Sequence, residues 1–268
     1  MKIKRRTLKK KHTKKSATKK ICALPGIMIP EPIGFEYENK EVNMNNNDLV
    51  NSLVSKGLLK PLSTEEFIFR KIDRLDFCES HIGCYVDRPI RILENQTMTA
   101  PHLHSYATTT LRDYLRPGTH VLDVGSGNGY LCAVFSYMVD IENTNGTVTG
   151  IDIYPKLIER SKENINKNHS QLFNTGRLKI ILGDGWKGYP SENPNPIYDV
   201  IHVGACAENI PLNLWNQLKP GGRMFIPVKG NDGGEYINII DKPIYIEKYG
   251  LINVRKTMNV RYVPLQKR

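Results

Sequence analysis

The chain has 268 residues, of which 40% are hydrophobic and 24% are charged. This balance suits one α/β domain with appendages and excludes a fibrous protein or a small disulfide-stapled fold. No apolar run approaches the roughly 20 residues of a membrane span, so we expect no membrane partner. The five cysteines lack CxxC or His-paired spacing, which predicts no metal site and a reducing compartment. We therefore expect a cytoplasmic protein.

The net charge of +11 comes from one end of the chain. The first 20 residues hold 11 of the 38 lysines and arginines and no acid, so the other 27 bases balance 27 acids. Such a run of like charges repels itself and buries no apolar surface. We expect residues 1–45 to be a disordered basic tail and linker, and residues 46–268 to form the folded domain. The open roles for the tail are a solvated segment of minor function, a nuclear address, an organellar presequence, and an electrostatic contact with RNA or an acidic surface.

The domain is expected to begin with a helical cap. Apolar residues at helical spacing predict a helix over 48–59. Ser63 and Glu66 form a capping-box pattern that predicts the start of a second helix. The predicted buried stripe of this helix is Phe67, Ile68, Ile72 and Leu75. A third helix is expected over 102–115.

The rest of the chain alternates between short apolar runs and helical patterns, which predicts a Rossmann-like fold: a doubly wound, mostly parallel sheet in an α/β/α sandwich. The expected parallel strands lie at 120–124, 148–153, 178–183, 199–204 and 223–228. The expected helices lie near 129–139, 155–168 and 211–218. Two later apolar segments, 236–241 and 259–265, have little helix between them and predict antiparallel edge strands.

A glycine-rich loop follows the first of these strands, in the sequence VLDVGSGNGYLCAV that begins at residue 121. Alternate glycines let the backbone turn tightly and approach a ligand. Tyr130 stands where a dinucleotide fold has its third glycine, and the loop is acidic. This favours S-adenosylmethionine, which carries an ammonium and a sulfonium but no pyrophosphate; an ordinary strand-to-helix turn is the alternative. The candidate cofactor-binding residues are Asp123, Gly125, Ser126, Gly127, Asn128 and Gly129.

Two further strand ends are acidic or glycine-rich. Asp152 ends the second strand, where a carboxylate accepts hydrogen bonds from both ribose hydroxyls. Its alternative role is to cap the helix that follows at Pro155. Asp184 and Gly185 follow the third strand, where Asp184 is a candidate acceptor for an adenine amino group. An ordinary Asp-Gly turn is the alternative there.

The fourth strand informs the choice of methyl acceptor. It lacks the Asn-Pro-Pro-aromatic pattern typical of amino-directed nucleic-acid methyltransferases. Cys206 suggests a cysteine nucleophile, but it has no proline partner and lies among small residues. Packing explains this cysteine better than catalysis does.

Several segments together resemble the protein-L-isoaspartate O-methyltransferases, over residues 46–266. These segments are NQTMTAPHLHSYA (95–107), VLDVGSGNGYL (121–131), GDGWKGYP (183–190), YDVIHVGA (198–205), LKPGGRMFIPV (218–228) and RYVPL (261–265). The resemblance implies a class I methyltransferase fold, S-adenosylmethionine as donor, and methyl transfer to the α-carboxylate of L-isoaspartyl residues in damaged proteins. The ester then closes to a succinimide. It also implies isoaspartyl peptides and proteins as partners and a monomeric enzyme.

The resemblance also implies roles for individual residues. Thr99 occupies the position of the family's active-site hydroxyl, usually Ser, and would be the catalytic residue. Gln96, Thr97 and Met98 match the segment over the cofactor. His104 matches a cofactor-side position, although a buried helix residue is the alternative. The remaining matches and departures are Gln266, where the family often has Thr near the site, Asn128 in place of a common Ser, and Glu208 in place of Pro.

Two alternatives remain open at this point. The basic tail is the main support for a methyltransferase directed to RNA, although the tail is separated from a neutral domain by a linker. A catalytically inactive relative that only binds altered peptides rests on Thr99 alone.

Overall fold

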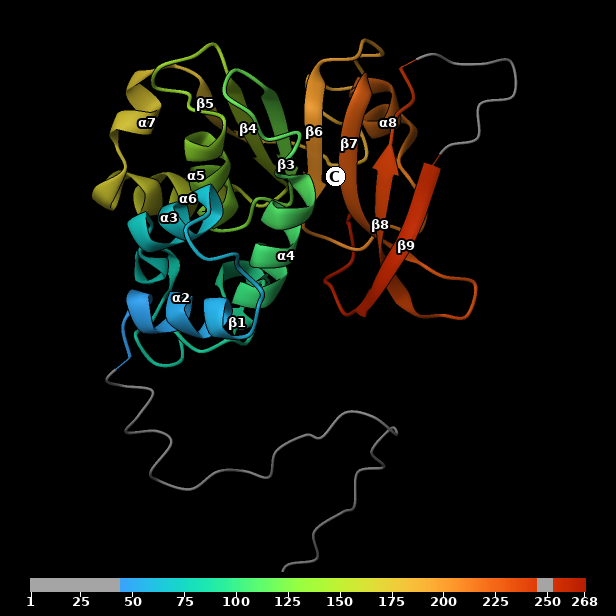
Figure 1. Cartoon of the computed structure of the whole chain (residues 1–268). Helices are drawn as coiled ribbons and strands as arrows, with labels where there is room; N and C mark the ends of the chain where they lie inside the picture. Colours follow the sequence, from blue (N-terminus) through green and yellow to red (C-terminus); the bar gives the residue numbers. More distant parts are fainter. Residues whose placement is uncertain (1–43, 245–252) are drawn as a thin grey trace, which may run out of the picture.

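The computed structural model describes residues 44–244 and 253–268 (Figure 1). The predicted basic tail lies outside this part of the chain, except for Met44 and Asn45. The strands are β1 (Ile90–Arg91), β2 (Thr97–Met98), β3 (His120–Val124), β4 (Thr147–Asp152), β5 (Leu178–Leu182), β6 (Tyr198–Val203), β7 (Leu218–Lys229), β8 (Glu235–Asp241) and β9 (Asn253–Val260).

The helices are α2 (Asn46–Ser55), α3 (Thr64–Lys71), α4 (Pro101–Leu111), α5 (Tyr130–Met138), α6 (Pro155–Asn168), α7 (Gln171–Asn174) and α8 (Leu212–Gln217), with short 3-10 helices η1 (Arg74–Phe77) and η2 (Leu93–Asn95). The short elements β1, β2, α7, η1 and η2 are not predicted from the sequence. Within the described ranges, no helix combines the length and the apolar character that crossing a membrane requires.

A seven-stranded sheet has the order β5-β4-β3-β6-β7-β8-β9. The strands from β5 to β7 pair in parallel, and β8 and β9 continue the sheet in antiparallel register. The predicted fold, a mostly parallel doubly wound sheet with antiparallel edge strands, is confirmed. Figure 1 shows the helical cap, made of α2, α3 and α4, below the rest of the domain, with α4 next to the central strands and α3 next to α5.

The two faces of the sheet carry separate hydrophobic cores. Successive side chains of a strand point to opposite faces. In β3, Val121 belongs to the core shared with the cap, α5 and α6, whereas Leu122 and Val124 belong to a second core with Leu214 of α8. Because both faces are covered, apolar residues on both sides of the parallel strands are buried, as in Val121 and Leu122 of β3.

The first two helices begin at side-chain caps. Asn45 caps α2 by a reciprocal pair of bonds with Asp48, of 3.1 and 3.0 Å, so this helix starts two residues before the prediction. Ser63 caps α3 as predicted and accepts from the Glu66 N–H at 3.2 Å. The Glu66 carboxylate turns instead to the backbone N–H of Leu62, at 2.6 Å. The cap is therefore confirmed, but the reciprocal half of the box is not formed.

The predicted buried stripe of the second helix is wrong at Phe67, whose exposed fraction is 68%. The prediction is confirmed at Ile68 and Ile72, which are buried, and the helix buries Phe69 in place of Phe67, because its inner face contacts α5 as well as the cap. The Phe69 ring meets the Tyr130 ring edge-on, with centroids 6.0 Å apart. The helix also ends at Lys71.

The last predicted strand, 259–265, is also misplaced. The edge strand β9 ends at Val260, and the following residues return to the end of β6. There Cys206 donates its N–H to the Val263 carbonyl at 2.8 Å, and Leu265 donates to the Cys206 carbonyl at 2.7 Å. The RYVPL segment is therefore a wall at the carboxyl end of the parallel strands.

The cysteines correct a further expectation. Cys78 and Cys84 form a disulfide across the loop after η1, so the expectation of reduced cysteines is wrong for this pair. Cys132 and Cys206 are free and buried. The spacing of Cys78 and Cys84 gave no signal, because their pairing depends on how the loop between them folds.

The exposure of the two α3 phenylalanines generates a stability prediction. We expect Phe69→Ala to lower the free energy of unfolding by roughly 3 to 5 kcal/mol, because it empties a buried site against Tyr130. Phe67→Ala is the matched control on the same helix and should change it by less than about 0.5 kcal/mol. Urea titration monitored by circular dichroism measures both. Similar losses in the two variants would contradict the packing described for α3.

Candidate functional site

A cleft opens at the carboxyl ends of β3 and β4. The sheet order reverses at β3, with β4 on one side and β6 on the other, and such a switch point separates the loops that follow the strands. The cleft is lined by Ile92, Gln96, Thr97, Val124, Gly125, Gly127, Ile151, Asp152, Ile153, Tyr154, Gly183, Gly185, Gly204, Ala205, Val263, Pro264, Leu265 and Gln266. The structure thus brings half of the predicted cofactor-binding residues to the lining of this cleft: Gln96, Thr97, Gly125, Gly127, Asp152, Gly185 and Gln266.

The glycine loop is built as its spacing predicts. Gly125, Gly127 and Gly129 have φ angles of 72°, 57° and 91°, in the left-handed region that favours glycine. Gly125 and Ser126 both donate their N–H groups to the Ile151 carbonyl, at 2.8 and 3.0 Å, which fastens the loop to β4. The Ser126 hydroxyl oxygen is buried and has no hydrogen-bond partner among the described residues. Such an orphaned group beside a cavity indicates a missing ligand contact.

Asp152 stands at the end of β4 and lines the cleft. One carboxylate oxygen accepts from the Gly127 N–H at 3.0 Å, and the other accepts from the Tyr154 N–H at 3.1 Å. Burial raises the pKa of this carboxyl, and these backbone donors oppose the rise. The carboxylate therefore fits both roles that the sequence allows: it organises the start of α6, and it presents acceptor oxygens to the cleft.

Asp184 lies differently from its neighbours. Gly183 and Gly185 line the cleft, and a Cβ on Gly185 would come within 2.5 Å of Val124 Cγ1. The Asp184 carboxylate accepts from the backbone N–H of Trp186 at 2.9 Å and of Arg268 at 3.0 Å. Its structural role is to close the turn and hold the end of the chain, and an adenine contact remains a prediction.

Tyr154 is a cleft residue that the sequence analysis missed. Its hydroxyl donates to Gln266 Oε1 at 3.0 Å and lies 3.4 Å from Gln96 Nε2. These bonds link the β2 segment to the C-terminal segment across the mouth of the cleft. An aromatic residue two positions after Asp152 is the only signal in the sequence that points to it.

Asp123 lies deeper, on the wall of a second, smaller cavity that also includes Ser126 and Asn128. Asp123 is buried and both of its carboxylate oxygens have protein partners. One lies 2.7 Å from His202 Nδ1, and the other accepts from the Cys132 thiol at 3.2 Å. Because both carboxylate oxygens have protein partners, Asp123 contributes negative charge behind the glycine loop rather than a direct hydrogen bond to a ligand.

Asn128 and Met98 join the glycine loop to the cap. The Asn128 side-chain amide donates to the Phe77 carbonyl of η1 and to the Met98 sulfur, the latter at 3.2 Å. Both residues are buried on the wall of the small cavity. The Asn128 side chain, which is larger than the common Ser, thus connects the glycine loop to η1 and to β2.

A third hollow, of about 660 Å³, lies on the other side of the β2 segment. Thr99 lines both this large cavity and the small one, and Thr97 and Gly204 line all three hollows. Tyr262 of the RYVPL segment lines the large cavity together with Thr99, and its phenol lies near the Thr99 side chain. The Thr97–Thr99 segment is therefore the partition between a small-molecule cleft and a cavity large enough for a peptide side chain.

His104 is buried on α4 and lines the small cavity, so it is both a core residue and a site residue. Its ring stacks on the Tyr130 ring, with centroids 5.0 Å apart and an angle of 20° between the planes. Cys206, the candidate nucleophile, does not line any of the three hollows described here. Burial raises the pKa of its thiol to about 11, so it stays protonated at neutral pH.

Comparison with known proteins agrees with this geometry. The family model Protein-L-isoaspartate(D-aspartate) O-methyltransferase (PCMT) matches residues 44–268. The protein-L-isoaspartate O-methyltransferase of Triticum aestivum is 42% identical over 227 residues, covering 83% of this chain and 92% of the relative. The protein-L-isoaspartate O-methyltransferase of Caenorhabditis elegans is 42% identical over 199 residues, covering 74% of this chain and 83% of the relative. A Plasmodium falciparum structure described as a PCMT in complex with S-adenosyl-L-homocysteine has a TM-score of 0.76 and 27% identity, covering 84% of this chain and 100% of that one. The chain therefore belongs to the protein-L-isoaspartate(D-aspartate) O-methyltransferase family.

Proposed function

We propose that this enzyme transfers a methyl group from S-adenosylmethionine to the α-carboxylate of L-isoaspartyl residues in damaged proteins, with Thr99 aiming that carboxylate. The observation that carries the proposal is the partition at Thr97–Thr99, which borders the cofactor cleft on one side and the large cavity on the other. Methyl transfer requires donor and acceptor to meet in line across such a boundary. The resulting ester closes to a succinimide, which begins repair.

The residues present fit the methyl donor. The Ser126 hydroxyl lacks a partner, the glycine loop offers close backbone approach, and Asp152 offers carboxylate oxygens where ribose hydroxyls would lie. We assign the remaining contacts to Gln96, Thr97, Met98, His104, Asn128, Asp184, Gly185 and Gln266, and we propose that Asp123 acts on the donor through its charge behind the glycine loop. When bound, S-adenosylmethionine supplies a methyl group on a positively charged sulfonium.

The acceptor needs no strong base. A carboxyl group with a reference pKa near ~4 is already an anionic nucleophile at neutral pH. The Thr99 hydroxyl donates a hydrogen bond to it, and the Tyr262 phenol next to Thr99 restricts where that hydroxyl points. The two residues hold the acceptor oxygen in place without competing for a proton.

Positioning then supplies most of the rate. Well-oriented reactants gain on the order of 7 to 11 kcal/mol over the same groups free in water. The apolar walls of the large cavity, including Leu103 and Val260, exclude water from the path of the methyl group. We propose that the enzyme acts as a monomer in the cytoplasm.

The direct test uses radiolabelled S-adenosylmethionine and two peptides that differ only by L-isoaspartate or L-aspartate at one site. We expect label on the isoaspartyl peptide and none above background on the aspartyl control, because only the former has a free α-carboxylate; in the aspartyl peptide that carboxyl group is in the peptide bond. Equal labelling of both peptides, or of neither, would contradict the proposal. Label on RNA in a parallel reaction would instead support an RNA-directed enzyme.

The role of Thr99 is tested by three substitutions at that position. Thr99→Val keeps the shape but removes the hydroxyl, and a hydrogen bond to a charged group is worth roughly 1.5 to 3 kcal/mol, so we expect kcat to fall about tenfold to a hundredfold. The kcat of Thr99→Ala should fall at least as far. Thr99→Ser keeps the hydroxyl, and its kcat should stay within about threefold of the wild type. Steady-state kinetics with the isoaspartyl peptide measures this. If the Val and Ser variants have the same kcat, Thr99 has no part in the mechanism.

The N-terminal segment is tested by deletion of residues 1–43, which keeps Asn45 as the cap of α2. Since the site lies in the described part of the chain, we expect kcat and KM for the peptide to remain within about twofold, whereas a tail that binds RNA would show salt-dependent RNA binding only in the full-length chain. Peptide kinetics and a filter-binding assay with single-stranded RNA measure the two properties. A collapse of kcat would place the tail or linker in the site.

A further inference from the structure

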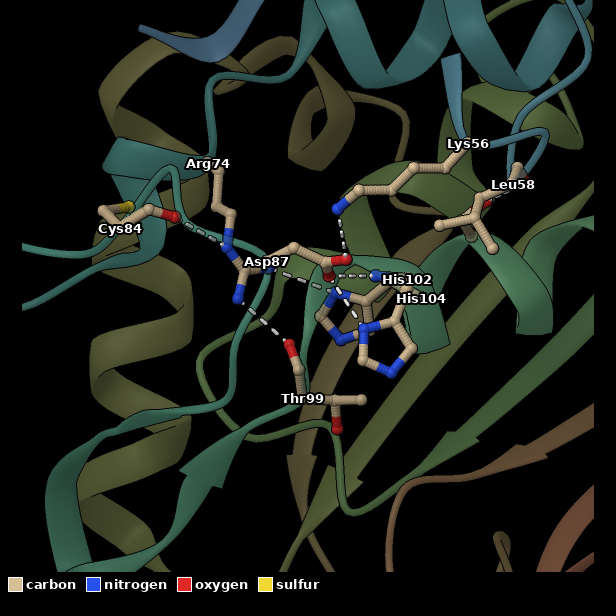
Figure 2. A network of polar contacts seen from close by, with 9 residues as sticks. Lys56, Leu58, Arg74, Cys84, Asp87, Thr99, His102 and His104 are labelled. Atoms are coloured by element: carbon tan, nitrogen blue, oxygen red, sulfur yellow. Dashed lines mark hydrogen bonds and ion pairs between the residues drawn. The ribbon is translucent and has the colours of Figure 1, made fainter. Parts of the chain in front are cut away.

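Arg74 is a buried cation in the cap, behind the site. Its exposed fraction is 1%, and its guanidinium donates hydrogen bonds in three directions (Figure 2). Nε donates to the Cys84 carbonyl at 3.0 Å, Nη2 donates to the Thr99 carbonyl at 3.0 Å, and Nη1 lies 3.3 Å from His104 Nδ1. These acceptors come from three separate segments, and none of them is a carboxylate.

Such an arrangement is costly for the fold. A buried charge without a hydrogen-bonded counter-charge loses much of its hydration, and here only the Tyr130 ring, 5.6 Å from the guanidinium carbon, and the more distant Asp87 carboxylate offset that loss. Burial lowers the pKa of Arg74 to about 10, which still leaves the guanidinium protonated at neutral pH. A neutral side chain would tie the cap together at less cost. The charge and the forked geometry therefore point to a role at the site that Arg74 faces.

The first consequence concerns Thr99. This residue lies between the end of β2 and the start of α4, in a short connection that also carries Ala100. The bond from Arg74 holds the Thr99 carbonyl on the cap side. On the other side, the Thr99 side chain meets the Tyr262 phenol. The backbone that carries the hydroxyl is therefore fixed from behind.

The second consequence concerns the proton on His104. An arginine N–H is always a donor, so the Nδ1 atom that faces it must be the acceptor. The neutral ring then carries its proton on Nε2. The pKa of His104 lies well below its ordinary value because of burial and because of the charges of Arg74, His202 and His102. With Tyr130 stacked on the ring, these are the groups that face it. His104 is thus an uncharged N–H donor on the wall of the small cavity.

We propose that Arg74 is a positioning residue for methyl transfer, which fixes the Thr99 backbone and holds His104 as the Nε2–H tautomer. The proposal rests on the proposed function and deepens it. Arg74 does not line any of the three hollows described above, so it acts through the two residues that do.

Two substitutions separate the charge from the geometry. Arg74→Lys keeps the positive charge but cannot reach three acceptors, and Arg74→Met removes the charge with a side chain of similar length. We expect kcat to fall roughly tenfold to a hundredfold in both, as for other small misplacements of reacting groups, with KM for the peptide changed less than kcat. Removing the charge also raises the pKa of His104. Any fall of kcat toward low pH that protonation of His104 causes should therefore begin at a higher pH in Arg74→Met than in the wild type or in Arg74→Lys.

Asn46→Ala is the matched structural control. The Asn46 side chain donates to the carbonyls of Phe69 and Ile72, at 2.8 and 3.2 Å, and accepts from the Arg74 backbone N–H at 3.3 Å. It therefore braces the same part of the cap without contacting Thr99 or His104. We expect this variant to lose thermal stability while kcat per folded molecule and its pH profile stay as in the wild type.

The ring nitrogens of His104, observed by ¹⁵N NMR of histidine-labelled protein, give a readout that does not depend on turnover. We expect protonated Nε2 and bare Nδ1 in the wild type, and a mixture of tautomers in Arg74→Met. If both Arg74 variants keep the wild-type kcat, pH profile and His104 tautomer, even at lower thermal stability, then Arg74 has only a structural role and the proposal is wrong. If the wild type fails to methylate isoaspartyl peptides while the NMR result holds, the proposed function fails and the positioning of His104 by Arg74 stands.

Discussion

The parallel pairing of β3 with β4 on one side and β6 on the other is the constraint on which the site depends. Strands reached by crossovers in opposite directions leave a crevice between their loops. The backbone then closes around that crevice: Gly125 binds β4 through the Ile151 carbonyl, and Gly204 donates to the Val124 carbonyl at 2.8 Å. Because Gly204 borders all three hollows, donor and acceptor share the end of one strand.

The acceptor side is assembled from parts that are distant in sequence. One wall is the β2–α4 connection, which is held from the cap by Arg74, and the other is the 261–265 segment, which is held at Cys206. Asp87 fixes the start of α4 by accepting from the His102 backbone N–H at 2.9 Å and pairing with Lys56 of α2 at 3.3 Å (Figure 2). The large cavity therefore forms only when the cap and the C-terminal segment are both docked on the sheet.

This division explains how much could be predicted from the sequence. The bounds of β3 and α6 follow directly from local signals, an apolar run before glycines and a proline-started amphipathic helix. Phe67 was misassigned because the spacing alone does not say which face of a short helix meets its neighbours. Likewise, Tyr154 and Arg74 act through contacts with residues far along the chain. Local patterns thus predict the donor cleft well, whereas the acceptor side depends on long-range packing and is recognised mainly through family resemblance.

The placement of charge follows from the chemistry. Transfer from a sulfonium to a carboxylate brings opposite charges together and cancels them, so a water-poor site favours the transition state over the separated ions. A cation bound directly to the carboxylate would stabilise that anion before reaction and weaken it as a nucleophile. In the proposed mechanism a neutral donor, the Thr99 hydroxyl, orients the acceptor with less of this penalty, while the neutral His104 Nε2–H lies on the wall of the small cavity. In this proposal the Arg74 guanidinium lies behind Thr99 and His104 and holds them in place. The reacting carboxylate forms no ion pair with it.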